Sequence, residues 1–215
     1  MENNNFTAYQ FENYDVEGLK LEINFSNTDF VEIKTHEEIN SPIENMEESF
    51  EPLLFGIDMN ITNIKNINDL KGKKMILLDG HHRYEYLKRN DIDKSIELVL
   101  ISIDDVEIFS YPSRLIIRKK EFEEILENYN FSNNVSSKFF VSVDDVKFFN
   151  EEILDIYQLY EFKNFCYVNE YISSAVDENK TNDEIIVNFT PIKVSEIVEN
   201  DSLFPPKSTW ITPRL

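Results

Sequence analysis

The sequence contains very little cysteine, glycine and histidine. Among its 215 residues there are one cysteine (Cys166), four glycines and three histidines. A single cysteine excludes an internal disulfide framework and is typical of a reducing compartment, so we expect a cytoplasmic protein. With so few glycines, each one is a candidate for a turn or for a close backbone approach.

Positive charge is also scarce. Lys and Arg number 21 against 41 Asp and Glu, and the formal net charge is −20. Such a surface repels phosphate backbones and gains nothing from counterion release, which argues against general nucleic-acid binding. A small anionic ligand is not excluded, because a local cluster of His, Arg and a helix N-terminus can overcome a distant, screened field.

Long apolar runs are absent as well. No segment approaches the roughly 18 uninterrupted apolar residues that a membrane helix needs. The amino-terminal stretch MENNNFTAYQFENYD is acidic and polar, unlike a secretory or transit segment. We therefore expect no membrane association. Hydrophobic residues make up 41% of the chain, enough for one large core or two small ones.

Hydrophobic periodicity predicts most of the secondary structure. The first half is predicted to contain two strands over 18–34 with a turn near 26–28, a helix from Thr35, a buried strand over 74–80, a helix over 81–91, and one or two strands over 96–109 with a turn at Asp104–Asp105. The second half is predicted to contain a helix over 119–129, strands over 138–149, one or two helices within 150–176, a strand over 183–189 and a helix over 193–200.

The order of these elements indicates the fold class. Strand, turn, helix and strand in the first half imply an α/β layer architecture. The second half has the pattern of an attached α+β portion. We place the boundary near residue 120, which gives domains 1–120 and 121–215.

The stretch DGHHR at 79–83 is the first candidate site. A strand that ends in Asp79 and Gly80 and turns directly into a helix presents backbone N–H groups that favour an anion. Arg83 can fork onto two phosphate oxygens. Asp79 can bind a metal, accept a proton or cap the helix. His81 and His82 point in different directions, so one can reach a ligand while the other orients the turn. The alternative is a purely structural capped turn.

The third histidine, His36, lies in KTHEEI beside two glutamates. Taken alone, His36 is typical of a surface residue in an acidic run. Glu37 or Glu38 is a candidate general base if its surroundings hold its pKa suitably. Acidic pairs at helix starts are mostly structural, which is the alternative here.

The carboxy-terminal stretch FPPKSTWITPRL is the second candidate site. Pro205–Pro206 fixes an extended approach. Lys207, Ser208 and Thr209 then offer one cation and two hydroxyls beside Trp210. If this tail folds over the DGHHR stretch at 79–83, Lys207 contacts phosphate and Trp210 stacks on a base. The alternative is an ordinary strand with Trp210 anchored in the core.

A family resemblance bears on both stretches. DGHHRYE at 79–85, after a strand and opening a helix, resembles the ParB/sulfiredoxin-like fold, where a Gly-x-x-Arg corner holds nucleotide phosphates. The histidine-bearing form is similar to the free serine kinases, which phosphorylate L-serine using ADP or ATP, and THEEI is similar to the segment that carries their proposed glutamate base. DGHHRYE together with the tail also resembles an uncharacterised family that pairs the two motifs. The resemblance covers roughly 18–118 as fold and the last thirty residues as a motif; the region of about 120–180 has no match.

The resemblance implies roles for the corner. Asp79, His81, His82 and Arg83 become the phosphate and catalytic corner, and the carboxylate of Asp79 is, by its own chemistry, our candidate ligand for Mg²⁺. Glu37 becomes the base, with Glu38 as the alternative. ADP or ATP is the implied nucleotide.

The sequence also departs from these families. The chain is short for a serine kinase and the neighbours of its motifs differ, which leaves the acceptor open. The DNA-binding features of ParB are missing. The cysteine of the sulfiredoxin corner is missing too, since Cys166 lies far along the chain.

The leading hypothesis is a small-molecule phosphotransferase with a nucleotide donor and, by resemblance, free L-serine as acceptor. Gly80 and Arg83 would hold the nucleotide phosphates with Lys207, Ser208 and Thr209, while the glutamate takes a proton from the acceptor hydroxyl. The alternative is a non-catalytic nucleotide- or phosphate-binding regulatory module. A third hypothesis is a protein-interaction domain that uses the acidic surface.

Overall fold

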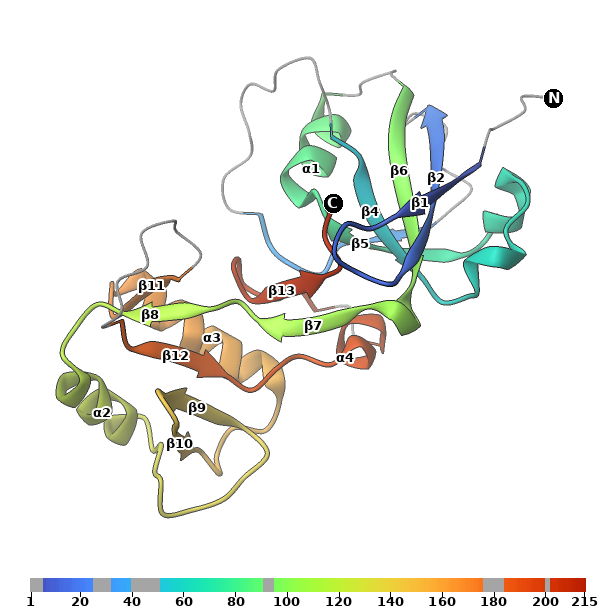
Figure 1. Cartoon of the computed structure of the whole chain (residues 1–215). Helices are drawn as coiled ribbons and strands as arrows, with labels where there is room; N and C mark the ends of the chain where they lie inside the picture. Colours follow the sequence, from blue (N-terminus) through green and yellow to red (C-terminus); the bar gives the residue numbers. More distant parts are fainter. Residues whose placement is uncertain (1–5, 25–31, 40–50, 91–94, 176–183, 200–201) are drawn as a thin grey trace. The chain divides into compact units, whose positions relative to one another are not determined.

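The computed structural model describes residues 6–24, 32–39, 51–90, 95–175, 184–199 and 202–215 (Figure 1). The chain divides into two compact units. The first comprises Met1–Glu107, Val194–Leu203 and Ile211–Leu215, and the second comprises Ile108–Lys193 and Phe204–Trp210. The division therefore follows Glu107, ahead of the predicted boundary near residue 120, and the tail contributes to both units. The nucleotide-binding role assigned to residues 1–120 stays a prediction.

The first unit is built on a mixed six-stranded sheet with the order β1-β2-β6-β4-β5-β3. Its strands are β1 (Thr7–Gln10), β2 (Glu17–Asn24), β3 (Glu32–Lys34), β4 (Leu53–Ile57), β5 (Lys74–Asp79) and β6 (Ser95–Ser102). Its helices are α1 (His81–Arg89), α4 (Val194–Glu199) and the 3-10 turns Ile61–Asn63, Ile67–Leu70 and Ile103–Asp105. Strand β3 runs parallel to β5 and β4 parallel to β6, while the other neighbours are antiparallel.

The centre of this sheet is apolar on both faces. Every residue of β4 is buried, as is the Met75–Leu78 run of β5. Tyr84 and Leu87 of α1 pack into the same core. Near-continuous apolar runs are typical of strands covered on both sides, and each fully buried Leu, Ile or Phe side chain contributes about 1.5–3 kcal/mol to folding. The core therefore fixes both the end of β5 and the start of α1.

The predicted strands over 74–80 and 96–109 are confirmed, and the helix predicted over 81–91 is confirmed as His81–Arg89. The turn predicted near 26–28 lies outside the described residues. The helix predicted from Thr35 is wrong over 35–39, where the backbone is not helical. Pairing of β3 with β5 keeps this chain extended, and it continues into a β-bridge at Glu37.

The second unit contains an antiparallel five-stranded sheet with the order β10-β9-β12-β8-β11. Its strands are β8 (Ser113–Leu115), β9 (Phe140–Val143), β10 (Val146–Phe149), β11 (Ile172–Ser174) and β12 (Ile186–Phe189), and its helices are α2 (Lys119–Asn128) and α3 (Ile156–Val168). Strands β7 (Glu107–Ser110) and β13 (Thr209–Thr212) form a separate two-stranded sheet. The turn between β9 and β10 has Asp144 at φ 52°.

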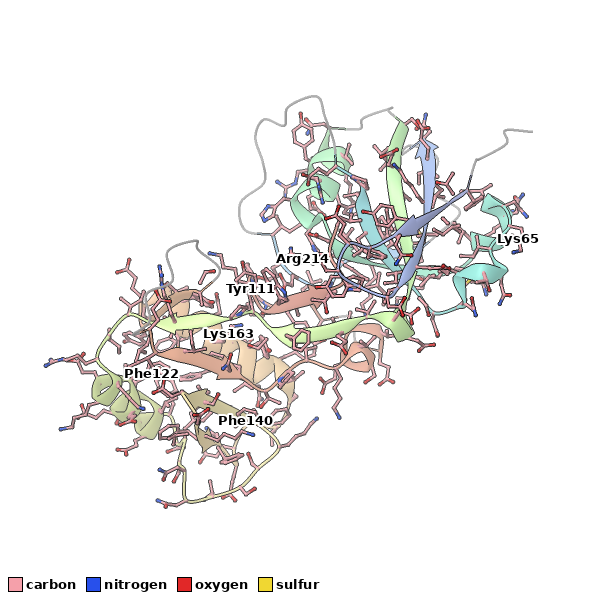
Figure 2. The ribbon with its side chains drawn as sticks, in the orientation of Figure 1. Lys65, Tyr111, Phe122, Phe140, Lys163 and Arg214 are labelled. Atoms are coloured by element: carbon pink, nitrogen blue, oxygen red, sulfur yellow. The ribbon has the colours of Figure 1, made fainter. Side chains whose placement is uncertain are left out.

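Helix α3 carries a buried lysine. The Lys163 ammonium donates to Ser110 Oγ at 3.2 Å, to Tyr111 O at 2.9 Å and to Ser208 O at 3.3 Å (Figure 2). Its Nζ also lies 5.1 Å from the centroid of the Tyr160 ring. A buried charge needs such partners, so Lys163 fixes the Ser208 backbone within the second unit.

The described residues thus form a mixed α/β fold with four α-helices and three sheets. Cys166, on α3, is fully buried, and burial raises the pKa of its thiol to about 12. A buried thiol with a raised pKa packs as a small hydrophobic group and is a poor nucleophile. Within the described segments, no helix has the length and apolar character needed to span a bilayer.

Candidate functional site

The corner between β5 and α1 requires glycine at position 80. Gly80 adopts φ 91° and ψ 24°, in the left-handed region. A Cβ atom at this position would lie 2.5 Å from Leu53 Cδ2 and 2.9 Å from Arg83 Nη2. Asp79 Oδ1 accepts a hydrogen bond from Gly80 N at 2.8 Å. The first helical bond runs from Tyr84 N to Gly80 O, so the N-terminal end of α1 lies directly at this turn.

Arg83 lies at this entrance. Its guanidinium folds back against Gly80, since both Nη2 and Nε approach the position of a Gly80 Cβ atom. The side chain is 14% exposed, and its Nη1 pairs with Glu51 Oε2, whose side chain is 83% exposed. The predicted phosphate-binding arginine is therefore positioned at the helix N-terminus, and its present partner is an anionic oxygen.

His36 and His81 form a contacting pair. His36 is only 1% exposed, so the expectation of a surface residue is wrong. The register of β3 with β5 places Lys34 opposite Ile76, which brings the next residues of the chain to the end of β5. His36 Nδ1 lies 3.0 Å from Leu77 O. The His36 and His81 rings meet edge to face with centroids 4.7 Å apart.

These contacts define the tautomers. A carbonyl oxygen only accepts, so His36 Nδ1 carries the hydrogen. His81 Nε2 lies 3.3 Å from the same Nδ1, and it can accept from that N–H only in the tautomer that carries its own hydrogen on Nδ1. Burial, and then the neighbouring His81, lowers the pKa of His36 well below its usual range. Burial, and then His82 and Arg214, lowers the pKa of His81 to about 4. Both imidazoles are neutral at pH 7.

Arg214 also reaches the corner, and the sequence interpretation missed it. Its Nη2 lies 3.4 Å from Asp79 Oδ1, and the two side chains are 41% and 24% exposed. Both residues belong to the first unit. The signal was present in the sequence, since Arg214 is the arginine of the tail motif FPPKSTWITPRL, but the lysine and hydroxyls of the same motif are the more obvious phosphate ligands.

The two candidate base residues line a pocket of about 330 Å³. Its walls are Thr35, Glu37, Glu38, Ile39, Glu85, Arg89 and Leu203. Glu37 is half-buried and Glu38 is exposed. His81, Glu85 and Arg89 follow one another at intervals of four along α1, so they share one helix face. That face runs from the histidine pair to the pocket.

The tail residues have structural partners in the second unit. Ser208 is buried; its hydroxyl donates to Pro205 O, and its carbonyl accepts from Tyr111 N at 3.0 Å. Lys207 is exposed with φ 61°, and Thr209 begins β13. The prediction that Lys207, Ser208 and Thr209 contact a nucleotide stays a prediction.

Metal binding was predicted at Asp79. Among the residues that the structure describes, no group of three or more His, Cys, Asp or Glu side chains is arranged to hold a metal ion. Magnesium in phosphate sites is bound by one or two carboxylates together with phosphate oxygens and water, so the single carboxylate of Asp79 fits that kind of site. The assignment stays a prediction.

A larger pocket in the second unit is lined by acidic residues, unlike the corner between β5 and α1, which carries arginines. Its volume is about 730 Å³, and its lining contains no Lys, Arg or His. Four glutamates contribute to it, namely Glu123, Glu127, Glu151 and Glu152. An anion is disfavoured there, whereas the corner of the first unit offers cations and helix amides.

No protein-family model and no curated protein matches the sequence. Solved structures do match. SbnI from Staphylococcus aureus with a carboxy-terminal truncation superposes with a TM-score of 0.54 at 12% identity, covering 86% of this chain and 81% of that one. A mutant free serine kinase in complex with ADP gives a TM-score of 0.52 at 14% identity, covering 95% and 91%. The free serine kinase in complex with AMP gives 0.51 at 15% identity, covering 95% and 90%.

These similarities define the class of fold. The chain has a mixed α/β fold that covers 81% of the truncated SbnI and 91% of the free serine kinase in complex with ADP. More particularly, that fold is shared with SbnI and with the free serine kinase, two of whose structures are complexes with ADP and AMP.

Proposed function

We propose that the protein is a small-molecule phosphotransferase that binds ADP or ATP at the corner between β5 and α1. One observation carries the proposal: the Arg83 guanidinium is held against the left-handed Gly80 turn at the entrance of a helix. Helix amides and the helix dipole favour an anion at such an entrance, and a guanidinium binds two phosphate oxygens at once. The fold shared with nucleotide complexes supports the choice of ligand.

The corner is proposed to be of the ParB/sulfiredoxin-like type. The Gly80-His81-His82-Arg83 sequence is the Gly-x-x-Arg pattern of that type, and the strand-turn-helix context supports it.

The residues of the corner stabilise the negative charge on the transferred phosphoryl group. Neutral His81 and the neighbouring His82 offer imidazole groups beside the helix entrance, and Arg83 neutralises phosphate oxygens. Asp79 would hold a magnesium ion, which supplies further neutralisation of phosphate charge when bound.

Proton transfer is assigned to Glu37, with Glu38 as the alternative. Glu37 is the more buried of the two, and both line the pocket beside α1. The carboxylate takes the proton of an acceptor hydroxyl, the hydroxyl oxygen bonds to the terminal phosphorus, and the nucleotide leaves with the electrons of the broken P–O bond. A pocket of about 330 Å³ suits a small acceptor, and free L-serine is the acceptor that the resemblance implies.

Thermal stability with and without nucleotide tests the binding step. ADP, ATP and AMP are added with and without Mg²⁺, and a ligand at about 100 times its dissociation constant should add roughly 2.7 kcal/mol. Arg83→Ala should weaken nucleotide binding and greatly reduce the shift. Arg118→Ala removes an exposed arginine of the second unit that pairs with Glu121, and it should leave the shift unchanged. If no nucleotide stabilises the protein, the proposal fails.

Turnover separates the enzyme from a non-catalytic regulatory module that binds the same nucleotide. Phosphoserine formation from ADP or ATP and L-serine is followed by mass spectrometry. Glu37→Gln should remove turnover and keep the thermal shift, and Glu38→Gln tests the alternative base. Nucleotide binding without any phosphorylated product would favour the regulatory module.

A further inference from the structure

The corner holds a second guanidinium besides that of Arg83. Arg214 Nη2 lies 3.4 Å from Asp79 Oδ1, the oxygen that also accepts from Gly80 N. Through Asp79, the arginine is held next to the residue at which α1 begins. Its charge is also among the causes that lower the pKa of His81, so the guanidinium lies close to that ring.

We propose that Arg214 is a second phosphate-binding residue of the nucleotide site and that Asp79 positions it. This inference rests on the proposed function, because it assigns a ligand contact within the same site.

Charge balance supports the assignment. Asp79 places a carboxylate one residue before the helix entrance, where it repels a phosphate group. Arg214 offsets that charge and adds a second guanidinium beside Arg83 and the N-terminus of α1, so that positive charge prevails at the entrance. In a chain with a formal net charge of −20, an anion site depends on such a local cluster.

The geometry leaves Arg214 able to bind a ligand. Its distance of 3.4 Å to Asp79 exceeds the 2.7–2.9 Å that is typical of a strong charge-assisted hydrogen bond. A guanidinium has five N–H donors, and the Arg214 side chain is 41% exposed. A phosphate oxygen can therefore reach N–H donors on the exposed part of this side chain.

The test is an ADP titration of the full chain by calorimetry at two salt concentrations. Arg214→Ala should weaken ADP binding about 10- to 100-fold, the range for loss of a charge-assisted hydrogen bond. The affinity of the variant should also fall less steeply with salt, because one charge contact is gone. Arg214→Lys should recover part of the lost ADP affinity, since lysine keeps the positive charge but cannot bind two phosphate oxygens in the planar, bidentate way of a guanidinium. Arg118→Ala should match the wild type.

The outcomes separate the inference from the proposed function. If Arg83→Ala weakens ADP binding and Arg214→Ala does not, the inference is overturned and the proposed function stands. If Arg214→Ala weakens ADP binding about 10- to 100-fold, as expected, but leaves the salt dependence of the affinity unchanged, Arg214 has a structural role. That result would also overturn the inference. If wild-type protein does not bind ADP, the proposed function fails and the assignment fails with it.

Discussion

Substituting alanine at Gly80 perturbs the corner in two ways that can be separated. The first is backbone strain, since Gly80 has φ 91°. The second is a steric clash, since the new Cβ would meet Leu53 Cδ2 at 2.5 Å and the Arg83 guanidinium at 2.9 Å. Gly72 provides a matched control: its φ is 70°, and a Cβ atom added there would meet no neighbouring heavy atom within 4 Å.

The expected losses follow from these two terms. Placing an L-residue in the left-handed region lowers the free energy of unfolding by about 1–2 kcal/mol. Alanine raises it by about 0.4–1 kcal/mol, because it restricts the unfolded chain more than glycine does. Overpacking adds about 1–3 kcal/mol. Gly72→Ala should therefore lower the free energy of unfolding by roughly 1 kcal/mol or less, and Gly80→Ala by roughly 2–4 kcal/mol.

Urea unfolding followed by far-UV circular dichroism measures both losses. In thermal melts, each kcal/mol corresponds to about 2–4 °C for a protein of this size. The difference between the two variants isolates the clash from the strain. Equal losses would refute the reasoning, because they would mean that Leu53 and Arg83 move aside at no cost.

Three further predictions concern other interactions. Glu51→Gln should raise ADP affinity about 2- to 5-fold, because an exposed carboxylate no longer competes with phosphate for Arg83; it should have no effect in an Arg83→Ala background, and a weaker affinity would contradict the competition. The pKa of His81 falls from 6.5 to about 4 on folding, so the unfolded chain binds more protons between these values. The contribution of His81 to the free energy of unfolding is therefore fully present above about pH 6.5. It is lost as the pH falls toward 4, and the loss amounts to about 3 kcal/mol. Urea midpoints between pH 6.5 and 5.5 should decline less in His81→Gln, and an equal decline would count against the assignment. Lys163→Met should destabilise the protein by about 2 kcal/mol, because backbone carbonyls lose a charged donor, whereas the exposed Lys207→Met should change stability by less than about 0.5 kcal/mol; urea titrations compare the two.

The local part of the corner was predictable from the sequence. An apolar run, an Asp-Gly pair and a helical pattern are all contained within 74–91, and each acts over a few residues. Strand β5, the turn at Gly80 and helix α1 follow from these signals alone.

The partners of the corner were not predictable in the same way. His36 is buried because β3 pairs with β5, and no local pattern reports that register. The acidic residues after Thr35 are typical of a helix start, but strand pairing prevails over that preference through 35–39. Arg214 and Asp79 are separated by 135 positions. Contacts of this kind depend on tertiary packing, which composition and periodicity do not encode.

The pairing of Arg214 with Asp79 has a consequence for biosynthesis. The chain leaves the first unit after Glu107, forms most of the second, and returns through Val194–Leu203 and Ile211–Leu215. On the ribosome, Asp79 and α1 emerge early, but their arginine follows only after most of the second unit has been made. Closing so long a loop carries an entropy cost that increases with the logarithm of its length. A nascent chain can therefore complete β5 and α1 co-translationally, while the charge balance of the corner is established only once the second unit has been translated.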